Sequence, residues 1–166
     1  MRYRSLKRSV LLVGCALTVL VGCGSTADVA GEYTIALTNR ANGCMFDNWT
    51  EGDTTTGVAL TVTQNGEAVT ASVGGVSGAA LDLVLASHEF IGSIDGEHMD
   101  LRITGERAAS MGACAYTLNA DVAADIDGDT LTGTITYRPQ TNGASDCNYL
   151  NTCSNVQAFN GTRPPR

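Results

Sequence analysis

The feature that most constrains this chain is a tight-turn signal that recurs between stretches of alternating apolar and polar residues. Asn-Gly and Asp-Gly favour two-residue hairpin turns, because both central positions of a type I′ turn need positive φ. The signal occurs three times, with its glycines 30 and 32 residues apart, at Asn65-Gly66, Asp95-Gly96 and Asp127-Gly128. Alternation with a period of two places one face of a strand in a core and the other in water. The pattern predicts a meander of antiparallel hairpins.

The alternating stretches predict an all-β domain. The expected strands are 31–38, 58–64, 67–74, 80–86, 88–94, 97–104, 115–126, 129–138 and 155–162. We expect at most a single helical turn, over 106–114. About eight antiparallel strands favour a small up-and-down barrel, because closure removes exposed strand edges. In that barrel the last strand pairs with 31–38; a β-sandwich is the alternative.

The turns also predict which residues face each other across each hairpin. With 65–66 as the central pair, Gln64 faces Glu67, and Val62 faces Val69 in the core. The same rule pairs Ile126 with Asp129, Ala124 with Leu131, Val122 with Gly133, Ser93 with His98 and Ile103 with His88. The two imidazoles would then lie too far apart to share a metal ion, so we interpret them as solvated or half-buried polar residues.

The N-terminal segment is a targeting signal. A basic start (Arg2, Arg4, Lys7, Arg8) precedes an apolar run, 10–21, that is shorter than the about 20 residues a membrane-spanning helix needs. The run ends in Leu20-Val21-Gly22-Cys23, which resembles the lipobox of bacterial lipoproteins. In that family the Cys is acylated and begins the mature chain. The alternatives are a plain secretory signal and a membrane-spanning anchor.

This resemblance implies a signal peptide over 1–22, lipidation of Cys23 and a location in the bacterial cell envelope. A short small-residue tether, 23–30, then precedes a single domain, 31–166. In the lipoprotein family, an Asp after the acylated Cys retains the protein at the inner membrane. Gly24 stands there instead, which implies the outer membrane.

The charge of the mature chain bears on its partners. After Cys23 there are six Arg and no Lys against 17 acids, a formal balance of −11. Nucleic-acid affinity depends on Lys and Arg that neutralise phosphates, so nucleic acid is excluded as a partner. Such acidity also disfavours contact with anionic lipid, so we expect the membrane to be reached through the N-terminal lipid.

The cysteines predict two disulfides. The lipoprotein resemblance implies that Cys15 is removed with the signal and that Cys23 is acylated, which leaves Cys44, Cys114, Cys147 and Cys153. Four cysteines in an exported domain allow three connectivities. We expect Cys147 with Cys153, because a single bridge would close that short loop, and Cys44 with Cys114. A zinc site is disfavoured because the close Cys pairs it needs are missing.

The start of the domain resembles the lipocalin or calycin group, whose first strand begins Gly-x-Trp. Here Gly31-Glu32-Tyr33 opens the first strand, with Tyr in place of Trp, and the second signature of the group is missing. In that group a basic residue on the last strand packs across the aromatic ring, a place that Arg163 could take. The resemblance implies carriage of a small apolar ligand.

No motif predicts catalysis, a cofactor or a metal. Asp125, Asp127 and Asp129 alternate as in a calcium loop, but Thr130 and Thr136 stand where an EF-hand needs Gly and Glu. We interpret Asp127-Gly128 as a hairpin turn. The sequence contains no nucleophile elbow, phosphate loop or His-Glu-x-x-His helix. The 17 acids allow many carboxylate pairs of the kind that glycosidases use, so a hydrolytic enzyme stays as the least favoured interpretation.

Two groups of residues bear on function, the large apolar residues of one loop and the small residues inside the barrel. Trp49, Met45 and Phe46 lie in a long polar stretch, 39–57, where they could plug one barrel end or form a contact patch; a plug is favoured. Ala71, Ala120, Ala124 and Gly133 face inward, which fits either a ligand cavity or tight packing. We expect a non-enzymatic envelope lipoprotein with an interaction or structural role; the alternative is binding of a small apolar ligand in the barrel.

Overall fold

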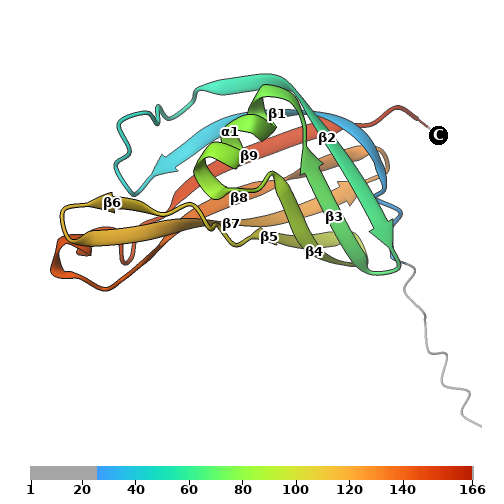
Figure 1. Ribbon diagram of the computed structural model, residues 1–166. Coiled ribbons are helices and arrows are strands. Elements are labelled where there is room, and N and C mark those ends of the chain that lie inside the picture. The colour runs from blue at the N-terminus through green and yellow to red at the C-terminus, as the bar shows by residue number, and fades with distance from the viewer. Residues whose placement is uncertain (1–25, 166) are drawn as a thin grey trace, which may run out of the picture.

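The computed structural model describes residues 26–165, so Cys23 and the predicted signal peptide lie outside the described residues. The strands are β1 Gly31–Asn42, β2 Thr54–Asn65, β3 Ala68–Val73, β4 Glu89–Asp95, β5 His98–Ile103, β6 Ala109–Met111, β7 Cys114–Asp127, β8 Thr130–Thr141 and β9 Asn155–Thr162. One helix, α1 Gly75–Leu85, joins β3 to β4, and a 3₁₀ turn, Ser145–Cys147, follows β8. The domain is all-β, as predicted (Figure 1).

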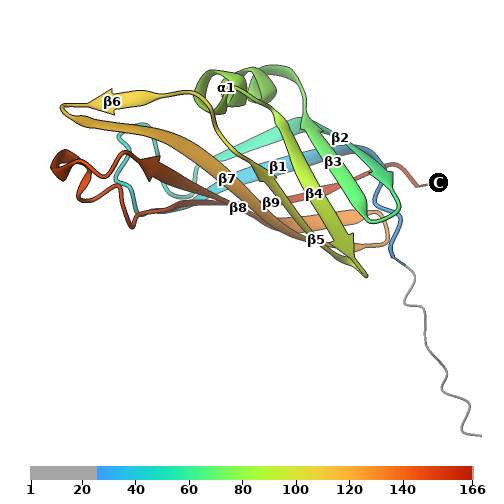
Figure 2. The same ribbon diagram turned by 60° about the horizontal axis from the view of Figure 1, so that its bottom comes forward.

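The strands close into an eight-stranded antiparallel barrel. Neighbours follow the order β5-β4-β3-β2-β1-β9-β8-β7-β6, and β5 also pairs with β7 to complete the ring. The predicted contact between the last strand and the first is present, with Thr34 opposite Thr162 and Thr38 opposite Ala158. The short β6 extends the edge of β7 beyond the ring (Figure 2). The barrel prediction is confirmed, and the β-sandwich alternative is not the fold.

The three tight turns lie where predicted, but each pairing is displaced by one residue on both strands. The observed partners are Gln64–Val69, Val62–Ala71, Asp95–His98, Ser93–Asp100, Ile126–Leu131, Ala124–Gly133 and Val122–Ile135. Gly66, Gly96 and Gly128 take the first central position, with φ of 63°, 59° and 59°, and an acid takes the second. This glycine-first arrangement is the one that type II′ turns use. The predicted facing pairs are therefore wrong.

The displacement leaves the core faces unchanged. The centre of each turn moves by one residue, so each residue faces a partner two positions further along the opposite strand. Side chains two positions apart lie on the same side of a sheet, so the buried faces stay the same. Val62 and Val69 are accordingly both buried, as predicted. His88, which we expected opposite Ile103, lies before β4 and outside the ladder, where its ring contacts Asp82 of α1.

One predicted strand is a helix. Residues 80–86 are predicted as a strand, but α1 covers 75–85. The stretch is rich in Ala and Leu, which favour a helix, and contains one charged residue, Asp82. The helix crosses one side of the open end of the barrel, and β3 pairs directly with β4 (Figure 1). Residues 109–111, within the expected helical turn, form β6 instead.

The half of the barrel nearest the hairpin turns is packed solid. Its interior leaves a void of only ≈30 Å³ among residues that include Phe90, Met99, Leu131 and Phe159. Ala71, Ala120 and Ala124 are buried in the core, and a Cβ on Gly133 would lie 2.8 Å from that of Ala124. The small inward residues therefore serve close packing rather than a ligand cavity at this level.

Arg163 and Tyr33 close that end of the barrel. The guanidinium carbon of Arg163 lies 5.5 Å from the centre of the Tyr33 ring, as the lipocalin resemblance implies. Arg163 donates hydrogen bonds to Asp129 and to the backbone carbonyls of Asp28, Ala30 and Gly128. Gly31 has φ of 152°, which L side chains rarely adopt, and a Cβ there would lie 3.0 Å from the Arg163 side chain, so glycine suits the start of β1.

The predicted disulfide pairing is wrong, although all four cysteines are paired. The bridges are Cys44–Cys153 and Cys114–Cys147. Barrel closure explains the first, because β1 ends and β9 begins side by side, with Asn42 opposite Asn155. The second forms because the chain after β8 folds back over the start of β7. Sequence distance misled the prediction, since these segments meet only in the closed sheet.

Candidate functional site

The open end of the barrel contains a cavity of ≈450 Å³. Its wall is mainly aliphatic and aromatic, with five amide or hydroxyl side chains. The aliphatic part includes Ile35, Leu37, Val73, Leu81, Leu118 and Ile135. The aromatic part is Phe46, Trp49, Tyr116 and Tyr137, and the polar part is Asn48, Thr55, Ser77, Asn155 and Gln157. The barrel is thus packed at one end and hollow at the other.

The loop between β1 and β2 forms one wall of this cavity. Trp49 meets Tyr137 of β8 edge to face, with ring centres 6.0 Å apart, and its indole N–H donates to the carbonyl of Arg40. Phe46 lies beside Trp49 in the lining, whereas Met45 is 69% exposed. The aromatic loop therefore covers the barrel end in part: two of its three large apolar residues turn inward, and a cavity remains beneath them.

Two asparagines fix this loop. Asn155, fully buried at the start of β9, accepts a hydrogen bond from the Cys44 backbone N–H and donates to the Asn42 side chain. Asn42 in turn accepts from the Phe46 N–H and donates to the Phe46 and Trp49 carbonyls. These shared hydrogen bonds hold the loop in one geometry, because breaking one would leave a polar group of the buried Asn155 unpaired.

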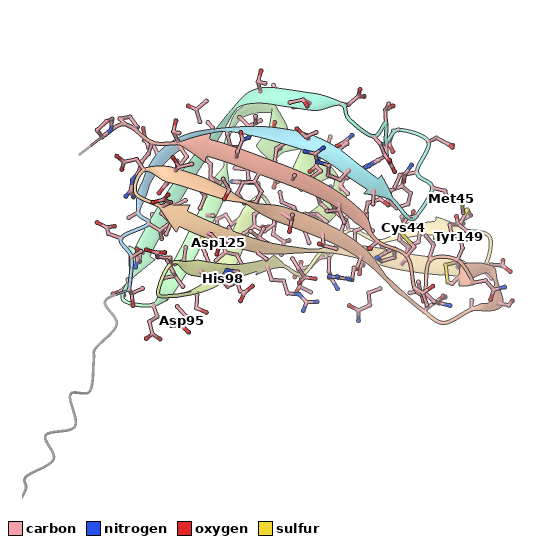
Figure 3. All side chains as sticks on the ribbon, turned by 180° about the vertical axis from the view of Figure 1, so that it is seen from behind. Cys44, Met45, Asp95, His98, Asp125 and Tyr149 are labelled. Carbon is pink, nitrogen blue, oxygen red and sulfur yellow. A yellow bond between two sulfur atoms is a disulfide. The ribbon has the colours of Figure 1, made fainter. Side chains whose placement is uncertain are left out.

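The two disulfides support the rim of the cavity. Cys114, Cys147 and Leu150 form a small second core, against which Phe46 and Tyr116 pack. The Cys44–Cys153 bridge ties the β1–β2 loop to the same segment. Outside this core the tip exposes Met45 and Tyr149, seen at the end of the molecule far from His98 in Figure 3. The lining is therefore held by covalent bonds as well as by packing.

A chain of hydrogen bonds crosses the polar part of the lining. The Tyr137 hydroxyl donates to Gln157 Oε1 at 2.8 Å, and Gln157 Nε2 donates to Asn39 Oδ1 at 2.8 Å. Burial raises the pKa of the Tyr137 phenol well above its ordinary value, because the charged form loses its hydration. The phenol is therefore neutral at physiological pH.

Helix α1 forms a further part of the cavity wall, at the open end of the barrel. Ser77, Ala80, Leu81 and Val84 line the cavity, whereas Leu85 is fully buried against the barrel. Val76 and Leu83, on the remaining side, are 89% and 72% exposed. His88 Nδ1 contacts the Asp82 carboxylate at 2.9 Å, which fastens the chain after the helix to its last turn.

His98 belongs to the opposite end of the molecule. Its Nδ1 lies 2.7 Å from Asp125 and its Nε2 lies 3.6 Å from Asp100, on the outer face of β5 and β7 (Figure 3). The hydrogen bond to Asp125 raises the pKa of the imidazole above its ordinary 6.5. Asp129, the last acid of the stretch that alternates as in a calcium loop, accepts a hydrogen bond from Arg163. Within residues 26–165, no group of three or more His, Cys, Asp and Glu is placed to hold a metal ion.

Sequence reasoning found part of this site. The sequence predicts that the aromatic loop lies at one end of the barrel and that the four cysteines form disulfides. Tyr137, Gln157 and Asn155 were missed, because a single polar residue on the inner face of a strand gives no pattern. The α1 wall was missed with the helix. Asn155 could have been located from the predicted pairing of the last strand with the first, because it begins the last strand and lies opposite Asn42.

The described residues include no helix long and apolar enough to cross a membrane. Comparisons with known protein families, with curated proteins and with solved structures find no match to this chain.

Proposed function

We propose that this protein is a lipid-anchored cell-envelope protein that binds a small apolar molecule at the open end of its barrel. The observation that carries the proposal is the ≈450 Å³ cavity with its apolar wall. Ligand pockets in proteins are typically about 300–1,000 Å³, mainly apolar, with a few placed polar groups. Of the two roles expected from the sequence, ligand binding is the one that this cavity favours.

A fluorescence measurement tests ligand binding. The uncharged dye N-phenyl-1-naphthylamine should brighten on mixing with the protein, and it should quench Trp49, the single Trp of the chain, by energy transfer. Ser77→Trp places a large side chain on the cavity wall and should weaken dye binding about tenfold or more. Ala79→Trp, on an exposed part of α1 outside the lining, is the control and should bind normally. Dye affinity that is equal in both variants would leave the interaction or structural role as the better proposal.

The envelope location rests on the lipobox, which lies outside the described residues. Ala27, four residues after Cys23, donates its backbone N–H to the Gly96 carbonyl, so a lipid on Cys23 would lie near the closed end of the barrel. Acylation there would hold the domain within about 14 Å of its lipid anchor. Cys23→Ser should move the protein from the outer-membrane fraction to the soluble fraction. A Ser variant that still partitions into detergent would refute acylation at Cys23.

A further inference from the structure

The polarity of the cavity wall bears on what kind of molecule it can hold. Among residues 26–165, those that line the cavity are apolar, aromatic, amide or hydroxyl side chains, and none is charged at neutral pH. Burying an ionised group without a charged partner is costly, and such a group instead loses its charge or stays outside. A charged head group therefore has no counter-ion inside the cavity.

The cations of the described chain are placed elsewhere. Arg163 is buried at the closed end with Asp129, and Arg102 and Arg138 both contact Asp121 on the outer wall. Arg40 and Arg107 belong to open-end segments but do not line the cavity. The single Lys of the sequence, Lys7, lies in the signal segment.

The rim disfavours the other way an anionic amphiphile could bind, with its tail inside and its head at the mouth. The open-end segments 39–53, 74–88, 104–113 and 142–154 contain six carboxylates and two arginines. The carboxylates are Asp47, Glu51, Asp53, Asp82, Glu106 and Asp146. A carboxylate head placed among them would meet net like charge, at a cost that salt screens only in part.

The polar chain inside favours an uncharged polar group. Tyr137 and Gln157 line the cavity and already bond each other, and each keeps further capacity to accept or donate one hydrogen bond. An alcohol, ester or amide could use that capacity without bringing a charge out of water. The lining thus offers polar contact but no charge compensation.

We infer that the ligand of this cavity carries no negative charge: it is a neutral, mainly apolar molecule with an alcohol, ester or amide group, and fatty-acid carboxylates are excluded. The inference rests on the proposed function, because it names the class of molecule that the same cavity takes.

Competition against N-phenyl-1-naphthylamine separates the two ideas. Dodecanol and laurate share one alkyl chain length, and laurate is fully ionised at about pH 8. We expect dodecanol to displace the dye about tenfold or more better than laurate does. Equal displacement by the two would overturn the inference and leave the proposed function standing. A protein that binds neither the dye nor dodecanol would contradict both.

A gain of charge at the rim tests the cause. Thr55→Arg puts a cation at the edge of the cavity and should raise the ratio of laurate affinity to dodecanol affinity several-fold. Thr63→Arg makes the same change of net charge on an exposed position of β2 outside the lining, and should leave both affinities unchanged. Laurate binding that improves equally in both variants, or in neither, would show that missing charge inside the cavity is not what rejects carboxylates.

Discussion

At the residue scale, Arg163 is the charged side chain that the described domain buries, and its bonds define the closed end. Its guanidinium makes four hydrogen bonds and covers Tyr33. A planar fork can serve several acceptors at fixed angles, which an ammonium cannot. Arg163 thus joins the last strand to the β7–β8 turn and to the chain that leads into β1.

Replacing Arg163 should therefore be costly. Arg163→Met removes four hydrogen bonds, to Asp129 and to three carbonyls, and we expect a loss of about 2–3 kcal/mol in the free energy of unfolding. Arg138→Met removes an exposed ion pair with Asp121 and should cost no more than about 1 kcal/mol. Urea unfolding of both variants measures the difference. Equal losses would mean that Arg163 contributes only as a surface charge does.

His98 gives the domain a pH-dependent contribution to stability. Its folded pKa is raised by Asp125, so the protonated ring is favoured in the folded state. That contribution is complete below the ordinary pKa of 6.5 and is lost as pH rises through the folded pKa. NMR titration should place the His98 midpoint above 6.5, and Asp125→Asn should lower it. A midpoint unchanged by Asp125→Asn would assign the shift to other groups.

At the element scale, α1 ends on a strained residue. Ala86 has φ of 66°, in the left-handed region, and its N–H donates to the carbonyl of Asp82. A Cβ makes this conformation unfavourable, and glycine removes the penalty. Ala86→Gly should raise the free energy of unfolding by about 0.5–1 kcal/mol. Ala79→Gly, within the same helix, should lower it by about 1 kcal/mol. Thermal unfolding of the two variants should shift in opposite directions, and a parallel shift would contradict the strain at Ala86.

The elements also show what the sequence could and could not predict. Period-two alternation placed most strands, because burial of one face leaves a mark on every second residue. The Asx-Gly pairs placed the turns but not their register, because glycine can take the first or the second central position of a two-residue loop. The helix lacked the usual marks: the described α1 has no side-chain cap, no acid in its first turn and no base in its last.

The disulfides illustrate a different limit. Cys44 and Cys153 are 109 residues apart and meet because β1 and β9 are neighbours in the closed barrel. No local spacing encodes that neighbourhood, although the predicted closure of the last strand on the first contained it. The cavity was likewise beyond sequence reasoning, since its volume depends on how far one loop and one helix reach across the open end.

At the scale of the whole molecule, the two ends of the barrel have separate tasks. The described chain begins and ends at the packed end, beside the hairpin turns (Figure 1). The disulfides, the aromatic loop and the cavity belong to the other end. Because Ala27 is bonded to Gly96, a lipid on Cys23 would hold the packed end next to the membrane. The cavity would then open away from the bilayer, toward the aqueous space.

Trp49 reports on this orientation, because it is the single Trp and it lines the cavity. β1 has 12 residues, so Trp49 lies about 25 Å or more above the closed end, allowing for strand tilt. In acylated protein bound to vesicles, lipids that carry a nitroxide on the head group should leave Trp49 emission unchanged, since a nitroxide quenches only at close range. The matched control carries Trp49→Phe together with Glu97→Trp, which moves the indole to the turn beside Gly96, and its emission should fall. Quenching of Trp49 as strong as that of the Glu97→Trp control would mean that the cavity faces the membrane and takes its ligand directly from lipid.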